Sequence, residues 1–238
     1  HRSSSGGGSW EFNKKMPKQW QIKYKNLTFN IKPMGFKHTG LFPEQAVNWD
    51  WMINKIKSEK REIKVLNLFA YTGGATVACL SAGASVCHVD SSKGMTTWAK
   101  ENVTSSGLAD KPVRFIVDDV VKFVNREIRR GNKYDAIIMD PPSYGRGANG
   151  EVWQFENNIY DLVELCTKVL SDNPLFFLIN SYTTGISSIW VLFSIFLFGD
   201  IWGFAGMLLG VPMFAIMYHW IKKLVFKGLD KNEPTQMS

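Results

Sequence analysis

The residues best suited to chemistry in this sequence are the five from Asp140 to Tyr144, which read Asp-Pro-Pro-Ser-Tyr. Pro141 and Pro142 stiffen this loop and carry no backbone N–H, so the loop presents carbonyl groups and one carboxylate. Such acceptors suit a nucleophilic amine, because accepting its N–H bonds leaves the lone pair directed at an electrophilic methyl group. A phosphate-binding loop would instead present N–H groups and a lysine, and this loop has neither.

A turn and a carboxylate earlier in the chain suit the binding of a nucleoside. Ala70–Gly74 ends in two glycines and opens a predicted helix, so its backbone can approach a ligand and offer free N–H groups. Asp90 lies seventeen residues after Gly73, where a carboxylate can accept hydrogen bonds from both hydroxyls of a ribose. Asp90 could instead cap the helix that begins near Lys93, so both roles stay open.

Two adjacent carboxylates follow a third predicted strand. Asp118 and Asp119 offer an acceptor for the amino group of an adenine, and whichever of the two does not face the ligand could cap the next helix. Together with Asp90 and the loop at Asp140, these strand ends favour a cofactor that joins a nucleoside to a sulfonium group over NAD.

The elements that must position these residues form a regular alternation of strands and helices. This alternation requires right-handed crossovers and gives a parallel sheet covered on both faces, whose ligands bind beyond the carboxyl ends of the strands. The predicted fold class is therefore α/β, with a Rossmann-like parallel sheet. Strands are predicted at 63–69, 84–89, 113–117, 134–139 and 175–179, helices at 45–57, 73–82, 93–105, 120–129 and 158–170, and an amino-terminal β-hairpin at 19–24 and 26–31.

Basic residues are concentrated near the start of the chain, whose formal net charge is +7. From Lys14 to Lys37 there are seven lysines and no acid, which suits a polyanion such as RNA. A solvated, lysine-rich hairpin face would give the same pattern, so both interpretations stay open.

The cysteines indicate a reducing compartment. Cys79, Cys87 and Cys166 lie in apolar surroundings without a CxxC pair, so we expect them to be reduced and structural, with no metal site. The sequence therefore predicts a cytoplasmic location for the α/β core. The serine- and glycine-rich stretch 1–9 has no apolar signal-peptide region and is predicted to be a flexible tail.

The alternating pattern stops after Gly185. Residues 186–199 and 201–221 form uncharged runs of 14 and 21 residues, separated by Asp200. A bilayer needs about 20 apolar residues, so only the second run is long enough to span one. The sequence predicts either a membrane hairpin, with membrane contact through residues 186–223, or two apolar helices that cover the edge of the sheet. The end, from Leu229, is polar and predicted to be disordered.

Three stretches in order, His38–Gln45, Asn67–Gly74 and Asp140–Pro142, resemble the bacterial large-subunit (23S) ribosomal RNA methyltransferase family, within the class I S-adenosylmethionine-dependent enzymes. The resemblance covers about residues 10–185. It implies that Thr39–Gln45 folds over the cofactor, and that the target base lies at the Asp140 loop. The cofactor-binding residues that it implies are Thr39, Phe42, Gln45, Ala70, Tyr71, Thr72, Gly73, Gly74, Asp90, Ser91, Asp119 and Val120, and the catalytic ones are Asp140, Pro141, Pro142 and Tyr144.

The sequence departs from the family in ways that bear on the reaction. Members that methylate C5 of cytosine place a cysteine nucleophile just after the fifth strand, whereas this chain has Asn180-Ser181-Tyr182 there. Because C5 chemistry requires a covalent adduct, methylation of a base nitrogen fits better. Tyr144 or Tyr182 is available to stack on the base, although each also fits a rim or core position. From the resemblance we expect this sequence to lack the family's small amino-terminal RNA-binding module and the last two strands of its sheet.

The segment after Gly185 resembles a different family. Trp190–Ser194 followed by Gly203–Pro212 is similar to the carboxyl end of the autoinducer-2 exporters, which implies a chimeric chain. The sequence thus predicts a methyltransferase acting on a base nitrogen of ribosomal RNA, and the alternative is an inactive or cofactor-binding-only remnant anchored to a membrane. The predicted parts are a flexible tail (1–9), a hairpin (10–37), a cofactor-binding core (38–185), an apolar helical segment (186–228) and a disordered tail (229–238).

Overall fold

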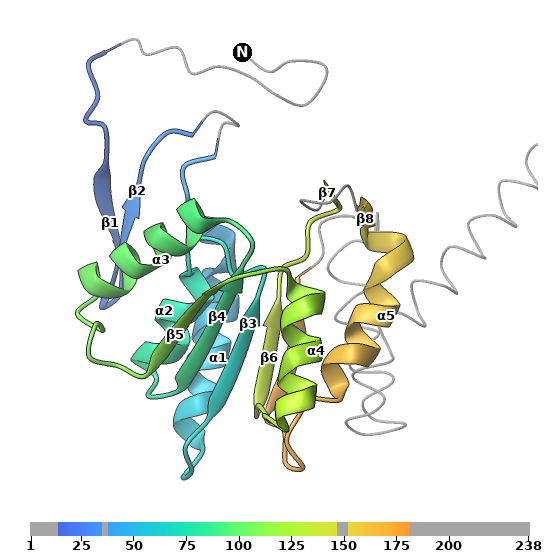
Figure 1. The fold of residues 1–238 in the computed structure, drawn as a ribbon. Helices are drawn as coiled ribbons and strands as arrows, with labels where there is room; N and C mark the ends of the chain where they lie inside the picture. The colour runs from blue at the N-terminus through green and yellow to red at the C-terminus, as the bar shows by residue number, and fades with distance from the viewer. Residues whose placement is uncertain (1–13, 35–37, 147–151, 181–238) are drawn as a thin grey trace, which may run out of the picture. The chain divides into compact units, whose positions relative to one another are not determined.

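The computed structural model describes residues 14–34, 38–146 and 152–180. Its centre is a five-stranded parallel sheet in the order β5-β4-β3-β6-β9 (Figure 1). The chain fills one side of β3 first and then the other, so the direction of winding reverses between β3 and β6. The strands of this sheet are β3 (Lys64–Leu68), β4 (Ser85–Asp90), β5 (Val113–Val117), β6 (Ala136–Met139) and β9 (Phe176–Ile179).

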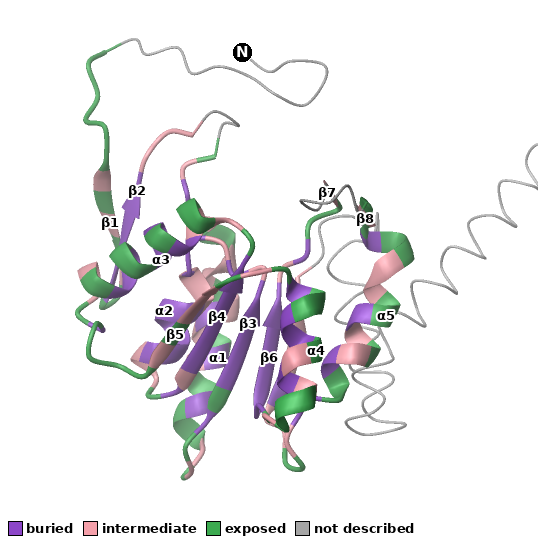
Figure 2. Ribbon diagram, in the orientation of Figure 1, coloured by how far each residue is buried: buried purple, intermediate pink, exposed green. Residues whose placement is uncertain are grey.

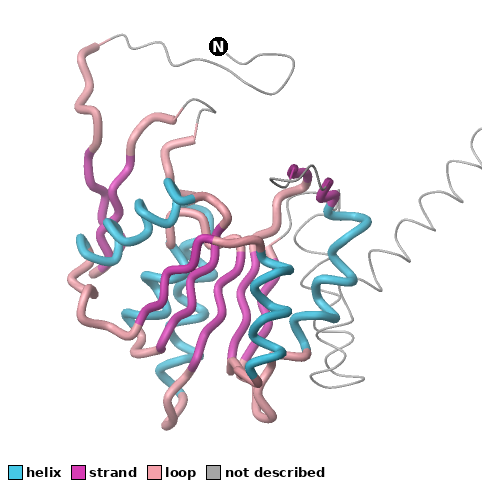
Figure 3. The backbone as a smooth tube through the Cα atoms, viewed as in Figure 1, coloured by secondary structure: helices cyan, strands magenta, loops and turns pink. Residues whose placement is uncertain are grey.

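Helices cover both faces of the sheet, as the backbone tube shows (Figure 3). One hydrophobic cluster joins α1, α2 and α3 to the sheet, and the other joins α4 and α5 to its opposite face. The predicted α/β fold with a parallel sheet and an amino-terminal hairpin is thus confirmed. The helices are α1 (Ala46–Ser58), α2 (Gly74–Ser81), α3 (Lys93–Ser105), α4 (Val120–Arg130) and α5 (Phe155–Thr167), with a 3-10 turn, η1 (Pro43–Gln45), before α1.

The central strands are apolar along almost their whole length because both of their faces are covered. In β6, Ala136 and Ile138 belong to the first cluster, whereas Ile137 and Met139 belong to the second. Successive side chains of a strand point to opposite faces, so each short apolar run supplies both layers of the core. Strands β3, β4 and β6 are buried along their length (Figure 2), apart from the exposed Lys64 at the start of β3 and the half-buried Ser85 at the start of β4.

The amino-terminal hairpin packs on the helices of the first cluster. Its strands, β1 (Trp20–Tyr24) and β2 (Leu27–Ile31), are antiparallel and turn at Lys25, whose φ is +52°. The Asn30 N–H donates to Asn102 Oδ1 of α3 at 2.8 Å, and Trp98 Nε1 donates to the Asn30 carbonyl at 2.7 Å. These bonds satisfy polar groups of β2 that the helices remove from water.

Two local features differ from the sequence prediction. A hairpin of two three-residue strands, β7 (Tyr144–Arg146) and β8 (Val152–Gln154), stands between the Asp140 loop and α5. Helix α5 covers 155–167 instead of the predicted 158–170. The apolar Val169 and Leu170, which the prediction placed in the helix, are buried just after its end. The predictions for residues 1–9 and 186–238 lie outside the described residues.

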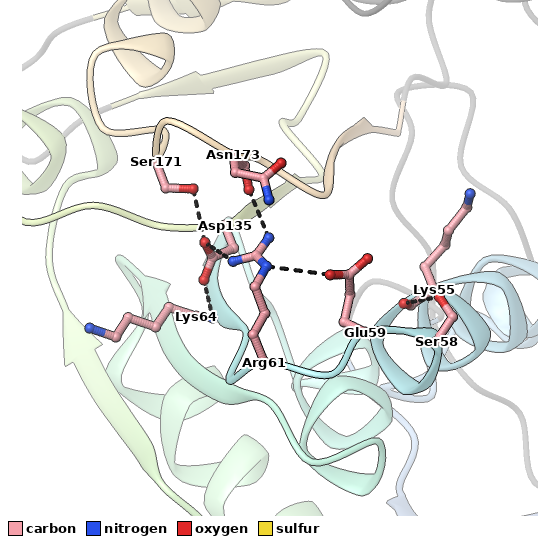
Figure 4. Close-up of polar contacts among 8 residues, drawn as sticks. All are labelled: Lys55, Ser58, Glu59, Arg61, Lys64, Asp135, Ser171 and Asn173. Atoms are coloured by element: carbon pink, nitrogen blue, oxygen red, sulfur yellow. Dashed lines mark hydrogen bonds and ion pairs between the residues drawn. The ribbon is translucent and has the colours of Figure 1, made fainter.

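A polar cluster around Asp135 lies at the end of the sheet where the strands begin, here called the amino edge (Figure 4). Arg61 donates to Asp135 Oδ1 at 2.6 Å, Ser171 Oγ donates to the same oxygen at 2.8 Å, and the Lys64 N–H donates to Oδ2 at 2.9 Å. Arg61 also donates to the Asn173 carbonyl at 2.7 Å. The cluster ties the start of β3 to the start of β6 and to the turn before β9.

Candidate active site

A cleft opens at the carboxyl ends of β3, β6 and β9, beside the point where the direction of winding reverses. Such a point is where open parallel sheets bind their ligands. The cleft also takes residues from α1 and from the segment before it. Its lining residues are Leu41, Phe42, Gln45, Trp49, Met52, Asn67, Phe69, Ala70, Tyr71, Thr72, Gly74, Ala75, Ile138, Asp140, Leu178 and Asn180.

The turn from Ala70 to Gly74 is held in an uncommon backbone shape. Tyr71 has φ of +50° and Gly73 has φ of +82°, in the left-handed region that costs a non-glycine residue free energy. Two contacts stabilise it: Thr72 Oγ1 donates to the Gly40 carbonyl, and Asn102 Nδ2 donates to the Thr72 carbonyl at 2.8 Å. A Cβ at Gly73 would lie 2.9 Å from Ala99 Cβ, so glycine also lets α2 approach α3.

Asp90 is joined to this turn by a hydrogen bond. Its Oδ2 accepts from the Tyr71 N–H and its Oδ1 accepts from the Ser92 N–H, both at 2.8 Å. Burial raises the pKa of Asp90, and the two N–H bonds oppose that rise without cancelling it. Helix α3 is capped by Ser92, whose hydroxyl accepts from the Met95 N–H, so the capping role considered for Asp90 is wrong.

Asp118 and Asp119 are both engaged locally. Asp119 caps α4 by accepting from the Lys122 N–H at 2.9 Å, and Asp118 forms an ion pair with Arg126. Of the two roles considered for Asp119, the structure therefore displays capping, and its contact with an adenine remains a prediction. Val120 is buried as the first residue of α4, and Ser91 is exposed after β4.

The Asp140 loop is fastened by Trp153, a residue that the sequence reasoning missed. Trp153 Nε1 of β8 donates to the Pro142 carbonyl at 2.6 Å. The same indole lies 5.8 Å, centroid to centroid, from the ring of Phe69, which lines the cleft. Trp153 thus connects the loop at β6 with the turn at β3. A tryptophan inside a polar stretch was the one available signal.

A buried polar chain behind the turn was also missed. Asn67, which lines the cleft, donates through Nδ2 to Thr76 Oγ1, and that hydroxyl is hydrogen-bonded to His88 Nδ1, each at 2.9 Å. Burial lowers the pKa of His88 to about 3, so its ring is neutral at physiological pH. Polar residues at inward positions of apolar strands were the signal that could have revealed this chain.

The structure brings together only part of the predicted site. Phe42, Gln45, Ala70, Tyr71, Thr72, Gly74 and Asp140 line one cleft, and Gly73 and Asp90 adjoin it through the turn. Tyr144 lies on β7 and is half exposed, and the Thr39 carbonyl accepts from the Lys32 N–H. The predicted residues that are not in the lining are Thr39, Gly73, Asp90, Ser91, Asp119, Val120, Pro141, Pro142 and Tyr144.

The cysteines take no part in the cleft. Cys79, Cys87 and Cys166 are buried and unpaired, and burial raises their pKa values to about 12, 11 and 12. Such thiols stay protonated at neutral pH and are poor nucleophiles. Across residues 14–34, 38–146 and 152–180, no group of three metal-ligating side chains is found.

The donor set of the cleft fits the parts of S-adenosylmethionine. Phe42 and Tyr71, whose ring centroids are 5.6 Å apart, both line it, and aromatic faces attract cations such as a sulfonium. The start of α2 at Gly74 and Ala75 supplies N–H groups for a carboxylate. Asp90 is a buried carboxylate beside the turn, the type of acceptor that hydrogen-bonds ribose hydroxyls.

Comparison with known proteins agrees with this geometry. Residues 3–185 match the family model described as S-adenosylmethionine-dependent methyltransferase, and the chain belongs to that family. The SAM-dependent methyltransferase from Agrobacterium tumefaciens is 41% identical with a TM-score of 0.70, over 75% of this chain and 58% of that one. A protein described as a methyltransferase, SMU.776, was solved with SAH; it is 26% identical with a TM-score of 0.65, over 73% and 45% of the two chains.

The curated relatives are longer proteins. The ribosomal RNA large subunit methyltransferase K/L of Shewanella frigidimarina is 33% identical over 147 residues, which is 61% of this chain. The chain spans about 20% of that relative's length. The enzyme of the same name from Syntrophotalea carbinolica is 26% identical over 183 residues, which is 76% of this chain and 25% of that relative.

The comparisons support the methyltransferase part of the sequence prediction and not the exporter part. The family match ends at residue 185, where the alternating pattern of the sequence also ends. Within the described part of the chain, no helix is both long and apolar enough to cross a bilayer. The predicted apolar segment 186–228 lies outside that part, so its nature stays a prediction.

Proposed function

We propose that this chain transfers the methyl group of S-adenosylmethionine to a nitrogen of a base in ribosomal RNA. The observation that carries the proposal is the position of Asp140, which lines the same cleft as the Ala70–Gly74 turn. The carboxylate of Asp140, which follows β6, therefore lies beside the Ala70–Gly74 turn, which follows the neighbouring strand β3. Bound S-adenosylmethionine supplies an electrophilic methyl group on a sulfonium, and the chain supplies the positioning.

The chemistry that the chain performs is orientation of the amine. Asp140 accepts the N–H bonds of the base, so that the lone pair of its nitrogen faces the methyl group. Trp153 holds the Pro142 carbonyl and so keeps the loop in one position. Asn180 also lines the cleft and offers a further amide. It follows β9, which lies on the other side of β6 from β3. No strong base is needed, because the amine can lose its proton after transfer.

The choice of a base nitrogen over a ring carbon rests on the residues after β9. C5 methylation needs a nucleophile that adds to the ring, and this place holds Asn180. The three cysteines are buried in α2, β4 and α5 and stay protonated at neutral pH. Ribosomal RNA as substrate rests on the curated relatives, of which this chain covers only a part. We also propose that residues 38–185 form the cofactor-binding core.

Methyl transfer to RNA with nucleoside analysis tests the proposal. Wild-type protein is incubated with labelled S-adenosylmethionine and large-subunit ribosomal RNA, and the digest is analysed for the labelled nucleoside. We expect an N-methylated base from the wild type and a fall of at least about a hundredfold in rate for Asp140→Asn. Asp110→Asn, an exposed carboxylate before β5, is the matched control and should keep the wild-type rate.

Two results would contradict the proposal. Labelled C5-methylcytidine would show that a nucleophile adds to the ring, whereas the described cleft supplies no cysteine for that step. Equal rates of methyl transfer for Asp140→Asn and the wild type would show that the Asp140 carboxylate takes no part in the reaction. Cofactor affinity is measured in parallel by calorimetry, because loss of both transfer and cofactor binding would assign Asp140 to the cofactor.

A further inference from the structure

Three lysines converge on one groove at the open end of the β1–β2 hairpin. Lys14, Lys15 and Lys18 line it together with Pro33, and all three lysines are exposed. The hairpin register pairs Trp20 with Ile31, so its continuation places Lys18 opposite Pro33. We call this feature the lysine groove; its lining residues are Lys14, Lys15, Met16, Pro17, Lys18 and Pro33.

The charge of the lysine groove is not neutralised by its surroundings. The chain carries no Asp or Glu from residue 12 to residue 43. Among the described residues, no carboxylate forms an ion pair with Lys14, Lys15 or Lys18, whereas Lys25 at the other end of the hairpin pairs with Asp50 at 2.6 Å. A concave surface lined by one sign of charge concentrates an anionic partner.

One wall of the lysine groove is fixed to the body of the protein. Lys32 lies over the ring of Trp98, with its Nζ 4.3 Å from the centroid, and the Lys32 N–H donates to the Thr39 carbonyl at 3.1 Å. Pro33, the next residue, therefore has a defined position. The rest of the lining is the consecutive, exposed stretch 14–18.

The lysine groove is also joined to the candidate active site. One residue beyond Pro33, Met34 Sδ accepts from the Tyr71 hydroxyl at 3.5 Å, and Tyr71 lines the cleft. Further along, the Gly40 carbonyl accepts from Thr72 Oγ1 in the cofactor turn. The segment that leaves the groove thus packs on the turn that the proposed function assigns to the cofactor.

We propose that the lysine groove binds the phosphate backbone of the RNA whose base enters the cleft. The inference rests on the proposed function, because it takes RNA as the substrate. Lysines contact phosphates without reading sequence, so their part is to set the position of the RNA and to supply affinity that depends on salt. An anionic membrane surface would also attract lysines, but the connection to the cleft favours the substrate of the site.

Binding of RNA by a triple variant tests the groove. The variant Lys14→Gln, Lys15→Gln, Lys18→Gln is compared with Lys57→Gln, Lys60→Gln, Lys111→Gln, which removes three exposed lysines next to the amino edge of the sheet. Fluorescence anisotropy with a labelled fragment of large-subunit ribosomal RNA is measured over a range of salt. At about 0.1 M salt we expect the groove variant to bind tenfold to a hundredfold more weakly, with a salt slope smaller by about 2.

The control and the cofactor distinguish the outcomes. The control variant should bind RNA within about twofold of the wild type, and both variants should bind S-adenosylhomocysteine like the wild type. Unchanged RNA binding by the groove variant, or an equal loss in the control, would overturn the inference. So would a loss of binding to phosphatidylserine vesicles with RNA binding intact.

Failure of the groove and failure of the proposed function give different results. If the wild type methylates RNA and the groove variant binds RNA normally, the proposed role of the lysine groove is refuted and the proposed function stands. RNA binding that depends on the groove, without methyl transfer by the wild type, removes the function and leaves the groove.

Discussion

At the amino edge of the sheet, Asp135 accepts hydrogen bonds from Arg61, Ser171 and the Lys64 N–H (Figure 4). At the opposite end, where the strands finish (the carboxyl edge), Asp90 accepts only from the N–H groups of Tyr71 and Ser92. Burial opposes ionisation of both carboxyls. The bonds to Asp135 outweigh it and lower the pKa, whereas burial prevails at Asp90 and raises the pKa.

The difference separates a carboxylate whose charge is compensated by a cation of the chain from one whose charge is not. Asp135 has three donors, one of which is the cation Arg61, so its charge is compensated within the folded chain. Among the described residues, no cation forms an ion pair with Asp90. A buried carboxylate without a cation costs stability, and ligand sites keep such groups because the ligand supplies the missing donors.

The largest effect is expected at the amino edge. Asp135→Ala removes three acceptor contacts, leaves the Lys64 N–H without its side-chain acceptor and takes from Arg61 its shortest ion pair, which should cost about 3 kcal/mol of unfolding free energy. Urea denaturation followed by circular dichroism measures the loss, with Asp110→Ala as an exposed control. The comparison between the edges fails if the two variants are equally stable.

An intermediate effect is expected at Trp153. Trp153→Phe keeps an aromatic ring beside Phe69 but removes the N–H that bonds to the Pro142 carbonyl. The catalytic loop should become less well positioned, at a cost of about 1 kcal/mol in transfer, or about fivefold in kcat. The KM for S-adenosylmethionine should stay unchanged. A rise in that KM with kcat intact would show that the indole serves the cofactor and not the loop.

The smallest effect is a pH dependence of opposite sign at the two edges. Asp135 contributes stability above its unfolded pKa of about 3.9, and this is lost as the pH falls through its lowered folded pKa. Asp90 binds its proton more tightly when folded, so its contribution declines as the pH rises from about 3.9 through its raised folded pKa.

Unfolding free energies measured over about pH 3–7 check this prediction. The deficit of Asp135→Asn relative to the wild type should shrink as the pH falls below about 4. Over the range above about 4, Asp90→Asn should gain stability relative to the wild type as the pH rises. Parallel curves for both variants would mean that the two carboxyls have similar environments.

Much of the sheet could be predicted from the sequence because its strands are covered on both faces. Such strands appear as short apolar runs, and the predicted strand 134–139 contains the buried β6, Ala136–Met139. The edge strand Val113–Val117 and the helix Lys93–Ser105 were also predicted with the bounds that the structure has. The three-residue strands of β7 and β8 lie in a polar stretch and have no such pattern. They depend on contacts such as that of Trp153 with Pro142, which join positions 11 residues apart.

The site was predictable at the level of strand ends and not of individual partners. Strand order places Asp140 and the Ala70–Gly74 turn at one edge, since neighbouring parallel strands end together. Whether Asp119 faces a ligand or caps α4 depends on the rotation of one side chain, which spacing does not specify. The chain of contacts from Asn67 through Thr76 to His88 joins two strands and a helix, so only packing reveals it.

Calorimetric titration with S-adenosylhomocysteine tests most directly whether the carboxyl edge is the ligand-binding edge. Wild type, Asp90→Asn and Asp135→Asn are titrated after circular dichroism has shown each to be folded. The account predicts that Asp90→Asn binds about 10- to 100-fold more weakly than the wild type, and that Asp135→Asn binds equally well. Wild-type affinity in Asp90→Asn, with loss of binding in Asp135→Asn, would contradict it.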